Sequence, residues 1–369
     1  MFPSNKRIRR AKAKQGRKFQ AKLCRIAEKM MQSYLARTGG TSKQPVQVSY
    51  KDVVMGEHLT PEQEQVARAM VETYQDIFMK SPDDIPPILK VDPVAWQLKE
   101  GVKPVRCRRP SWGPAQRAFL KHWTQKALEQ GLIVPAGHKS AWASRPVLVP
   151  KYRGDTPKGA VPDDIRVCID YIAVNERIKR LVDQYPDPQE LLRKAAGHKY
   201  YFTADSQKQF NSVPLKEGLS QEMTAFWTPL GLMKYTRLVM GAKNASAIAQ
   251  ALFARFMAEE LDVDNLERIV NFQDDFVGFA NEWPQFMSAL EAFFKMCRKT
   301  NINLNPAKMY VGVSQAKFYG YVVSERGLEP AEKNLDPIRK LVAPTNRSEV
   351  RSLLGLFVQF RSFLSLIHI

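Results

Sequence analysis

Two adjacent carboxylates between two apolar segments constrain the fold of this chain more than any other sequence feature. Asp274 and Asp275 separate residues 269–272 (IVNF) from residues 276–279 (FVGF). Short apolar runs on either side of a polar pair predict two strands joined by a hairpin turn. Adjacent carboxylates repel each other, and a bound divalent cation would remove that conflict. Taken alone, the pair is compatible with an exposed turn or with a metal site.

A third carboxylate ends an earlier predicted strand. Residues 200–204 (YYFTA) are strand-like and lead directly into Asp205. The later pattern predicts a helix at 242–261, a hairpin at 269–280, a helix at 284–300 and a strand at 317–323. Helices that alternate with antiparallel strands in this order indicate an α+β sheet covered on one side.

This order of elements changes the interpretation of the Asp-Asp pair. Asp205 would lie at the same edge of the sheet as Asp274 and Asp275. Three carboxylates can hold two Mg²⁺ ions, which phosphoryl transfer places roughly 3.5–4 Å apart to activate the attacking oxygen and stabilise the leaving group. Mg²⁺ favours a few carboxylates together with substrate phosphate oxygens. The three aspartates are therefore predicted to be catalytic metal ligands.

The part of the chain before Asp205 contains several predicted helices and extended segments. Thr60 and Gln63 form a capping box around Pro61, which predicts the start of a helix. Another helix is expected from Pro114 to Gly131. Extended or strand-like segments are expected at 89–109, 146–150 and 166–171, with a polar loop at 154–164.

Composition excludes several classes of protein. No apolar run approaches the roughly 18 residues of a membrane span. The four cysteines lie far apart without a CxxC pair, which argues against a zinc site or a disulfide framework and fits a reducing compartment. The five histidines are equally scattered.

The formal net charge is +19, and residues 1–50 contain thirteen Lys or Arg but one acid, Glu28. Such an arm suits a nucleic acid, although a solvated tail and an organelle transit peptide are the alternatives.

Several segments resemble a known family. Residues 272–275 (FQDD) resemble the aromatic-x-Asp-Asp box of reverse transcriptases, and residues 201–215 resemble the box that holds their first metal ligand. Other segments resemble gypsy-type (Metaviridae-like) LTR-retrotransposon enzymes in the same order along the chain. They are SAWAS at 140–144, VLVPKYRGD at 147–155, RVCIDYIAVNERI at 166–178, LVMGAKNA at 238–245, NLNPAK at 303–308, FYGYVV at 318–323 and RSLLGL at 351–356. Each box is weakly specific, but their order and spacing over residues 59–363 are strongly specific.

The resemblance implies a right-hand polymerase with fingers, palm and a partial thumb. It implies an RNA-directed DNA polymerase that uses two Mg²⁺ ions, with Mn²⁺ as a substitute, a primed RNA or DNA template and deoxynucleoside triphosphates. It also implies an intracellular location, in a cytoplasmic particle or the nucleus. The expected regions are a basic, weakly ordered arm at 1–57, a helix and extended lead-in at 58–104, fingers at 105–198, palm with part of the fingers at 199–324, and partial thumb or connection at 325–363.

The resemblance also assigns roles to individual residues. Asp205, Asp274 and Asp275 would hold the metal ions, with Ser206 beside them. Lys151 and Arg166 would bind the triphosphate, a contact that suits an ammonium and a planar guanidinium; ordinary surface charge is the alternative. Phe210 would block a ribose 2′-hydroxyl, unless it is a core aromatic. The remaining assignments are Met240 and Gln273 at the nucleotide and primer terminus, Tyr319, Gly320 and Tyr321 in the primer grip, and Lys308 as a proton donor to pyrophosphate.

The sequence departs from the family pattern at several positions. Phe272 replaces the usual Tyr, Gln209 replaces a small residue, and Val239 and Ser246 each replace a Pro. These changes leave the metal ligands in place but predict lower catalytic efficiency. The alternative function is a catalytically weak or inactive relic that binds nucleic acid: the intact aspartates favour the enzyme, and the truncated thumb favours the relic. Residues 364–369 (LSLIHI) do not continue the pattern, resemble a translated sequencing-adapter end, and are expected to be a non-native tail.

Overall fold

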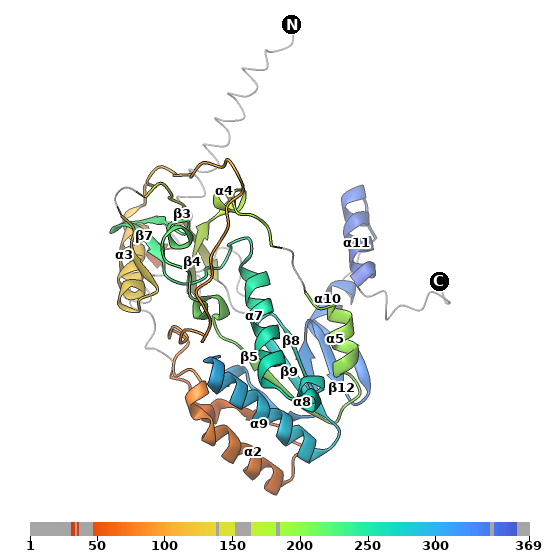
Figure 1. The fold of residues 1–369 in the computed structure, drawn as a ribbon. Coiled ribbons are helices and arrows are strands. Elements are labelled where there is room, and N and C mark those ends of the chain that lie inside the picture. The colour runs from red at the N-terminus through yellow and green to blue at the C-terminus, as the bar shows by residue number, and fades with distance from the viewer. Residues whose placement is uncertain are drawn as a thin grey trace. The chain divides into compact units, whose positions relative to one another are not determined.

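The computed structural model describes residues 31–33, 35–36, 47–137, 140–151, 164–181, 185–339 and 343–359 (Figure 1). The chain divides into two compact units. The first comprises Met1–Gln47, Lys80–Asp183 and Lys208–Ala249, and the second comprises Val48–Met79, Gln184–Gln207 and Gln250–Ile369. Residues 1–30 of the predicted basic arm, most of the predicted polar loop and the predicted non-native tail lie outside the described residues.

A five-stranded sheet in the order β1-β10-β5-β9-β8 forms the centre of the second unit. Its strands are β1 (Val54–Met55), β5 (Tyr200–Asp205), β8 (Ile269–Phe272), β9 (Asp275–Ala280) and β10 (Tyr310–Val313). All neighbours pair antiparallel except β1 and β10, which are parallel. The predicted hairpin and the predicted strand that ends at Asp205 are both confirmed.

One face of this sheet is dry and aromatic. Helix α9 (Trp283–Thr300) covers β5 and β9, and the Phe293 ring lies 5.2 Å from Phe202 and 5.1 Å from Phe276. Phe202 pairs with Gly278 in the ladder, and a Cβ on Gly278 would lie 2.0 Å from its ring. The missing side chain therefore makes room for a buried aromatic ring.

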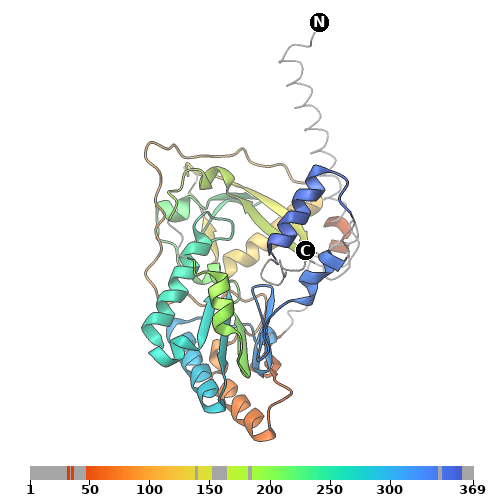
Figure 2. The same cartoon turned by 90° about the vertical axis from the view of Figure 1, so that its right-hand side faces the viewer.

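The opposite face is covered by different elements. Helix α5 (Pro188–Ala195) and the strands β11 (Gln315–Phe318) and β12 (Tyr321–Ser324) pack on it through a buried cluster that includes Leu192, Tyr201 and Val277. Figures 1 and 2 both draw α5 beside these strands. Both faces of the sheet are thus covered, which corrects the prediction of a sheet covered on one side. The sequence pattern missed α5 because that helix is short.

The predicted strand at 317–323 is wrong, because the chain turns back within it. Strands β11 and β12 pair antiparallel around Tyr319 and Gly320, and β13 (Gly327–Pro330) extends the sheet. Both turn residues have positive φ, 47° and 80°. A two-residue hairpin loop requires this backbone conformation, which glycine adopts without strain.

The C-terminal boundary of the predicted basic arm also needs correction. Strand β1 lies within residues 1–57 but is part of the central sheet, and a short 3-10 helix, η1 (Tyr50–Asp52), precedes it. Further back, Met31 is buried in a cluster with Ala115 and Ile165, and Leu35 packs against the same cluster. These residues are therefore part of folded units, because their apolar side chains and backbone groups find partners there.

Two further helices begin near the predicted residues. Helix α2 (Pro61–Thr73) has the predicted capping box, since the Gln63 N–H donates to Thr60 Oγ1 and the Thr60 N–H donates to Gln63 Oε1. Helix α7 (Ala245–Glu260) begins in the first unit and continues in the second. The other second-unit elements are η2 (Gln75–Ile77), α8 (Val263–Glu267), η4 (Pro306–Lys308), α10 (Glu332–Arg339) and α11 (Arg347–Gln359).

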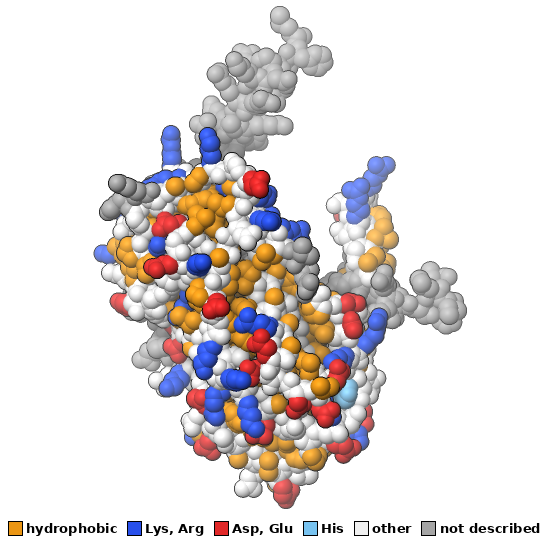
Figure 3. Space-filling model, in the orientation of Figure 1, with side chains coloured by type: hydrophobic (Ala, Val, Ile, Leu, Met, Phe, Trp, Pro, Cys, Tyr) orange, Lys and Arg blue, Asp and Glu red, His pale blue; other side chains and the backbone are white. Residues whose placement is uncertain are grey.

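The charges on the helical surface of the second unit are mixed. On the face drawn in Figure 3, Lys and Arg side chains are interspersed with acidic side chains over α2 and α9. Arg298 pairs with Asp76, and Lys295 pairs with Glu291 at 2.8 Å. This surface therefore lacks the single-sign field that residues 1–50 carry in the sequence. In the described part of the chain, no helix is long and apolar enough to cross a membrane.

The first unit is assembled from small sheets and short helices. A three-stranded sheet has the order β2-β7-β6, and strands β3 and β4 form a separate hairpin ladder. The predicted helix from Pro114 and the predicted strands at 146–150 and 166–171 are confirmed. The elements are α3 (Pro114–Glu129), β2 (Ile133–Pro135), β3 (Arg145–Lys151), β4 (Asp164–Asp170), α4 (Ile172–Asn175), η3 (Gln209–Ser212), α6 (Leu219–Glu222), β6 (Phe226–Thr228) and β7 (Gly231–Tyr235).

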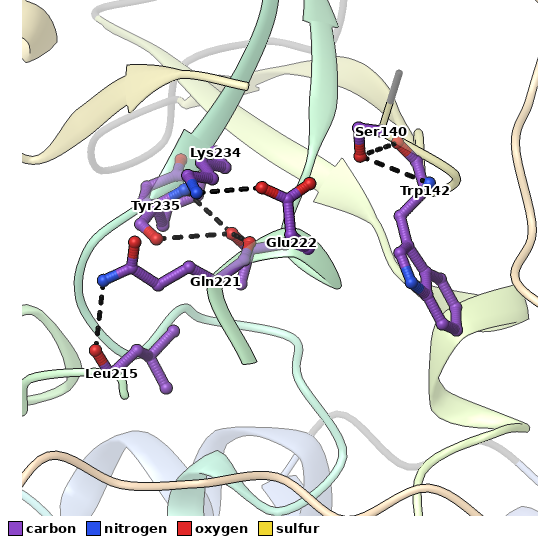
Figure 4. Close-up of polar contacts among 8 residues, drawn as sticks. Ser140, Trp142, Leu215, Gln221, Glu222, Lys234 and Tyr235 are labelled. Carbon is purple, nitrogen blue, oxygen red and sulfur yellow. Dashed lines mark hydrogen bonds and ion pairs between the residues drawn. The ribbon is translucent and has the colours of Figure 1, made fainter. Parts of the chain in front are cut away.

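A polar network fixes α6 against β7 within the first unit (Figure 4). Lys234 Nζ lies 2.8 Å from Glu222 Oε1, and the Tyr235 N–H donates to Thr224 Oγ1 over 2.8 Å. Gln221 Nε2 donates to the Leu215 carbonyl oxygen over 3.1 Å. These partners satisfy polar groups that would otherwise be costly to bury, so we interpret the network as structural.

Candidate active site

The five-stranded sheet brings two of the predicted metal ligands directly opposite each other. Asp205, the last residue of β5, pairs in register with Asp275, the first residue of β9. Asp274 precedes Asp275 in the hairpin turn, and its carbonyl oxygen accepts a hydrogen bond from the Ser206 N–H over 2.8 Å. Strand pairing between distant segments therefore gathers the three aspartates at one edge of the sheet.

A buried amide network holds this hairpin turn in place. The Gln273 N–H donates to Gln250 Oε1 over 2.6 Å, and Gln250 Nε2 donates to Asn271 Oδ1 over 3.0 Å. Asn271 Nδ2 then donates to the carbonyl oxygens of Gln273 and Asp275, over 2.9 Å and 3.1 Å. Gln273 has a φ of 56°, a conformation that non-glycine residues seldom adopt. The network compensates for this backbone conformation and orients the Asp-Asp turn.

Sequence reasoning missed Gln250 and Asn271. Both side chains are buried although each lies within an apolar pattern, Gln250 on the stripe of α7 and Asn271 inside β8. A polar residue in such a position must find a hydrogen-bond partner, and that requirement was the available signal.

Two aromatic side chains pack beside the turn. The Phe272 ring lies 4.7 Å from the Tyr319 ring in an edge-to-face arrangement and 6.2 Å from the Tyr185 ring. Phe272 therefore links the Asp-Asp hairpin to the turn between β11 and β12. The roles predicted for Tyr319 and Gly320 stay predictions; the predicted partner Tyr321 is buried in the cluster beneath the sheet.

Lys308 supplies a cation to the three-aspartate edge. Its Nζ lies 2.8 Å from Asp205 Oδ2, and side-chain exposure is 60% for Lys308 but 12% for Asp205. The same segment also binds the Asp205 backbone, because the Asn305 N–H donates to the Asp205 carbonyl oxygen over 3.0 Å. The structure thus places Lys308 on a predicted metal ligand, while its predicted role as a proton donor stays a prediction.

The electrostatics of the site disfavour three charged carboxylates. The pKa of Asp275 is raised to about 6, first because the surrounding protein desolvates the carboxylate and then because Asp274 and Asp205 repel its charge. The pKa of Asp274 is raised as well, again mainly by desolvation and further by Asp205. Lys308 offsets part of both effects. Protons or metal ions would each relieve this repulsion.

The residues present suit a divalent oxygen-binding metal. Aspartate oxygens are the donors that Mg²⁺ prefers. Desolvation, followed by repulsion between the carboxylates, raises the pKa values of Asp274 and Asp275, so a nearby positive charge would stabilise their charged forms. In the described part of the chain, however, no three His, Cys, Asp or Glu side chains are already arranged as a ligand set.

A cavity of about 760 Å³ opens beside these groups. Asp205, Asp275 and Lys308 line it together with Val54 and Met55 of β1 and with Gln315, Ala316 and Lys317 of β11. Asp275 retains accessible surface here although its carboxylate is partly desolvated. Asp205 and Asp275 therefore line a space that admits water and ligands.

The remaining predicted nucleotide-binding residues belong to the first unit, whereas Gln273 belongs to the second. Lys151 and Arg166 lie on the β3–β4 ladder. In its backbone register, Lys151 is opposite Asp164 and Arg166 is opposite Val149. Phe210 is half-buried in η3, and Met240 is 57% exposed. The structure thus brings Lys151 and Arg166 onto one hairpin. Their binding roles, and those of Phe210 and Met240, stay predictions.

The five-stranded sheet, with aspartates at a strand end and in the adjoining hairpin turn, has the architecture of a polymerase palm. Residues 154–323 match the family described as "Reverse transcriptase (RNA-dependent DNA polymerase)". All three aspartates lie inside the matched segment.

The curated relatives of this chain include transposon polyproteins. The chain is 28% identical over 247 residues to the "Retrovirus-related Pol polyprotein from transposon 297" of Drosophila melanogaster, covering 66% of this chain and 22% of that protein. It is 24% identical over 251 residues to the "Transposon Tf2-3 polyprotein" of Schizosaccharomyces pombe, covering 68% and 18%. The chain therefore spans about a fifth of the length of these relatives.

Solved structures support the fold. A foamy viral protease-reverse transcriptase in complex with double-stranded DNA has a TM-score of 0.67 at 20% identity and covers 81% of this chain and 59% of that chain. Another structure of a foamy viral protease-reverse transcriptase with double-stranded DNA has a TM-score of 0.69 at 19% identity and covers 89% and 56%. The predicted α+β polymerase fold is confirmed.

Proposed function

We propose that this chain is the polymerase region of an LTR retrotransposon of the gypsy type, acting as an RNA-directed DNA polymerase. It would add deoxynucleotides to the 3′ end of a primer on an RNA or DNA template and release pyrophosphate. Foamy viral relatives of the same fold have been seen with double-stranded DNA and with an RNA/DNA hybrid, which supports a primed template as the partner. We place the protein inside the cell, in a cytoplasmic particle or the nucleus, where deoxynucleotides are available.

The observation that carries this proposal is the register of β5 and β9. Because Asp205 is directly opposite Asp275 and Asp274 lies in the adjoining turn, three carboxylates share one accessible edge of the sheet. Two Mg²⁺ ions, or Mn²⁺ in their place, would supply activation of the primer 3′ oxygen and stabilisation of the leaving pyrophosphate. Asp205 and Asp274 would hold both ions, Asp275 would complete the primer-side ion, and Ser206 would adjoin them.

The other residues would bind and select the substrates. Lys151 and Arg166 would neutralise the triphosphate, and their positions on one hairpin support a joint role. Phe210 would exclude a ribose 2′-hydroxyl, while Met240 and Gln273 would contact the nucleotide and the primer terminus. Tyr319 and Gly320, with Tyr321 behind them, would hold the primer strand. Lys308 would donate a proton to the pyrophosphate.

Primer extension tests the proposal directly. The 369-residue chain is incubated with Mg²⁺, deoxynucleotides and a labelled DNA primer on an RNA template. We expect extension that is lost in Asp274→Ala and kept in Asp264→Ala, a matched change of an exposed aspartate on α8. Failure of a folded wild-type chain to extend any primer would contradict the proposal.

A Phe210→Val variant should accept ribonucleotides more readily. Unchanged selection between deoxyribose and ribose would contradict the role proposed for Phe210 in excluding the 2′-hydroxyl.

One observation favours a second function, a catalytically weak or inactive relic that binds nucleic acid. In the described residues, the metal ligands are not yet arranged as a set, and Asp205 is paired with Lys308. A relic would retain a salt-dependent affinity for a primed template without incorporating nucleotides. A binding assay run beside primer extension therefore separates the two functions.

A further inference from the structure

The Lys308 ammonium group contacts a carboxylate that is predicted to bind metal. Its Nζ is 2.8 Å from Asp205 Oδ2, so this oxygen already has a cationic partner. Asp205 is nearly buried and belongs to the carboxylate set whose charges repel one another. Lys308 is therefore the nearby cation that partly neutralises this set in the described structure.

The backbone of Lys308 is held while its side chain remains free to leave. Lys308 ends η4, where Asn305 Oδ1 accepts a hydrogen bond from the Ala307 N–H over 3.1 Å and Asn305 Nδ2 donates to Gln207 Oε1 over 2.9 Å. The side chain, by contrast, is 60% exposed and lines the cavity. Rotation of its flexible stem would release Asp205 without disturbing the sheet.

We propose that Lys308 is a resident counter-cation that competes with the divalent metal for Asp205. This inference rests on the proposed function, because it assigns Asp205 to metal binding. An ammonium and a divalent cation repel each other at contact distance, and the carboxylate gains more from the ion of higher charge. Metal loading therefore displaces the Lys308 side chain, which then lies beside the site as a cation available to an anionic phosphate.

Two consequences separate this role from a purely structural ion pair. A structural pair stabilises the fold, and its loss would leave the metal affinity unchanged or weaker. A competing cation lowers the metal affinity, so its removal would make metal binding tighter. The proposal also links the two roles of Lys308, because the ammonium can serve the pyrophosphate only after it has left Asp205.

Mn²⁺ binding to the full chain tests the proposal without nucleic acid or nucleotides. Free Mn²⁺ is followed by its electron paramagnetic resonance signal in wild type and in Lys308→Met, which keeps most of the length of the side chain and removes its charge. We expect the dissociation constant to fall about tenfold in Lys308→Met, because a unit charge near the ion is removed. Lys308→Arg keeps the charge and should remain close to wild type.

The matched control is Lys317→Met, because Lys317 lines the same cavity from β11 and is not paired with Asp205. Its dissociation constant should change less than twofold. Unchanged or weaker Mn²⁺ binding in Lys308→Met, or an equal gain in Lys317→Met, would overturn the proposal. Absence of Mn²⁺ binding in all variants would overturn it as well, since no metal would then compete.

Amine labelling provides a second measurement on the unmodified chain. Acetylation of Lys308, read by mass spectrometry, should become faster when Mg²⁺ is added, while that of Lys317 should not. In Asp205→Asn, Lys308 should react quickly even without metal. An acetylation rate of Lys308 that stays the same when Mg²⁺ is added to the wild-type chain would contradict the proposed competition. Primer extension is measured separately, so loss of the proposed polymerase activity and failure of this inference give different results.

Discussion

The two faces of one five-stranded sheet have opposite physical character. The face under α9 buries Phe202 and Phe276 against Phe293, and its polar content is minimal. The other face begins with the same apolar packing, through Tyr201 and Val277, but ends in Asp205 and Asp275 beside a cavity. Because side chains alternate along a strand, β5 and β9 each serve both faces. Stability and chemistry can therefore be changed separately by mutating residues that are neighbours in the sequence.

The largest expected effect is on chemistry from the carboxylate face. Asp205→Asn keeps the shape of the side chain but removes a metal ligand, so we expect polymerisation to fall by about 10³-fold or more, equivalent to about 4 kcal/mol of transition-state stabilisation. Single-nucleotide incorporation under saturating substrates measures it. The free energy of unfolding should change by less than about 1 kcal/mol, because a charged pair is lost but carboxylate repulsion is relieved. A large loss of stability would show that the two faces are not separable.

The second effect is on stability from the aromatic face. Phe202→Ala removes a fully buried ring, and we expect unfolding free energy to fall by about 3–5 kcal/mol because a cavity remains. Urea denaturation followed by tryptophan fluorescence measures it. Activity per folded molecule should stay within a few-fold of wild type, unlike in Asp205→Asn.

Gly278→Ala provides the control for this packing. Its new Cβ would lie 2.0 Å from the Phe202 ring, so the change should cost about 1–3 kcal/mol by overpacking. In a Phe202→Ala background the same change should cost much less, because the clashing ring is absent. Equal costs in both backgrounds would remove the proposed contact between the two residues.

The third effect concerns the buried amide network of Gln250 and Asn271, which orients the Asp-Asp turn. Asn271→Ala removes the donor to the carbonyl oxygens of Gln273 and Asp275, so the Asp-Asp turn should lose its orientation. We expect a 10- to 100-fold loss of catalytic rate, about 1.4–2.7 kcal/mol, because positions near reacting atoms tolerate little displacement. The ratio of kcat loss to KM change distinguishes the cause: an orientation effect lowers kcat, whereas a nucleotide contact would raise KM.

The contrast between the faces also explains how much the sequence could predict. Local patterns were sufficient for the capping box of Thr60 and Gln63, for α9, and for the hairpin that contains Asp274 and Asp275. The residues of the site followed from the order of strands, which brings Asp205 to Asp275. Contacts between distant segments had no local signal. The Lys308–Asp205 pair, the Gln250–Asn271 bonds and the parallel pairing of β1 depend on such contacts.

The turn at Tyr319 and Gly320 shows a different limit. Six nearly continuous apolar or aromatic residues favoured one strand, whereas the chain reverses at two residues of positive φ. Tyrosine seldom adopts this conformation, so its presence there could not be expected from propensity. In the folded chain, Asn334 Nδ2 donates to the Gly320 carbonyl oxygen over 2.7 Å, and Tyr319 packs on Phe272. Tertiary contacts compensate for the backbone conformation.

The smallest effect is the pH dependence of the metal-free protein. The folded-state pKa of Asp275 is raised to about 6, above the value near 4 of an unfolded aspartate, because of desolvation and the neighbouring carboxylates. The folded state therefore binds the proton more tightly. The stabilisation that protonated Asp275 contributes to the folded state is complete below about pH 4 and is lost as pH rises through 6. Solvent access reduces the expected loss to about 1 kcal/mol.

Denaturation with chelator present, at pH values from 4 to 7.5, measures this effect, and the raised pKa of Asp274 adds to it in the same direction. Asp275→Asn should flatten the profile, whereas Asp264→Asn on α8 should leave it unchanged. Added Mg²⁺ should restore stability mainly above pH 6, because the carboxylates must lose their protons before they can bind the ion. A profile that rises between pH 4 and 6 in wild type and stays the same in Asp275→Asn would mean that other groups dominate. Repulsion between Asp205, Asp274 and Asp275 would then destabilise the folded protein less than their positions indicate.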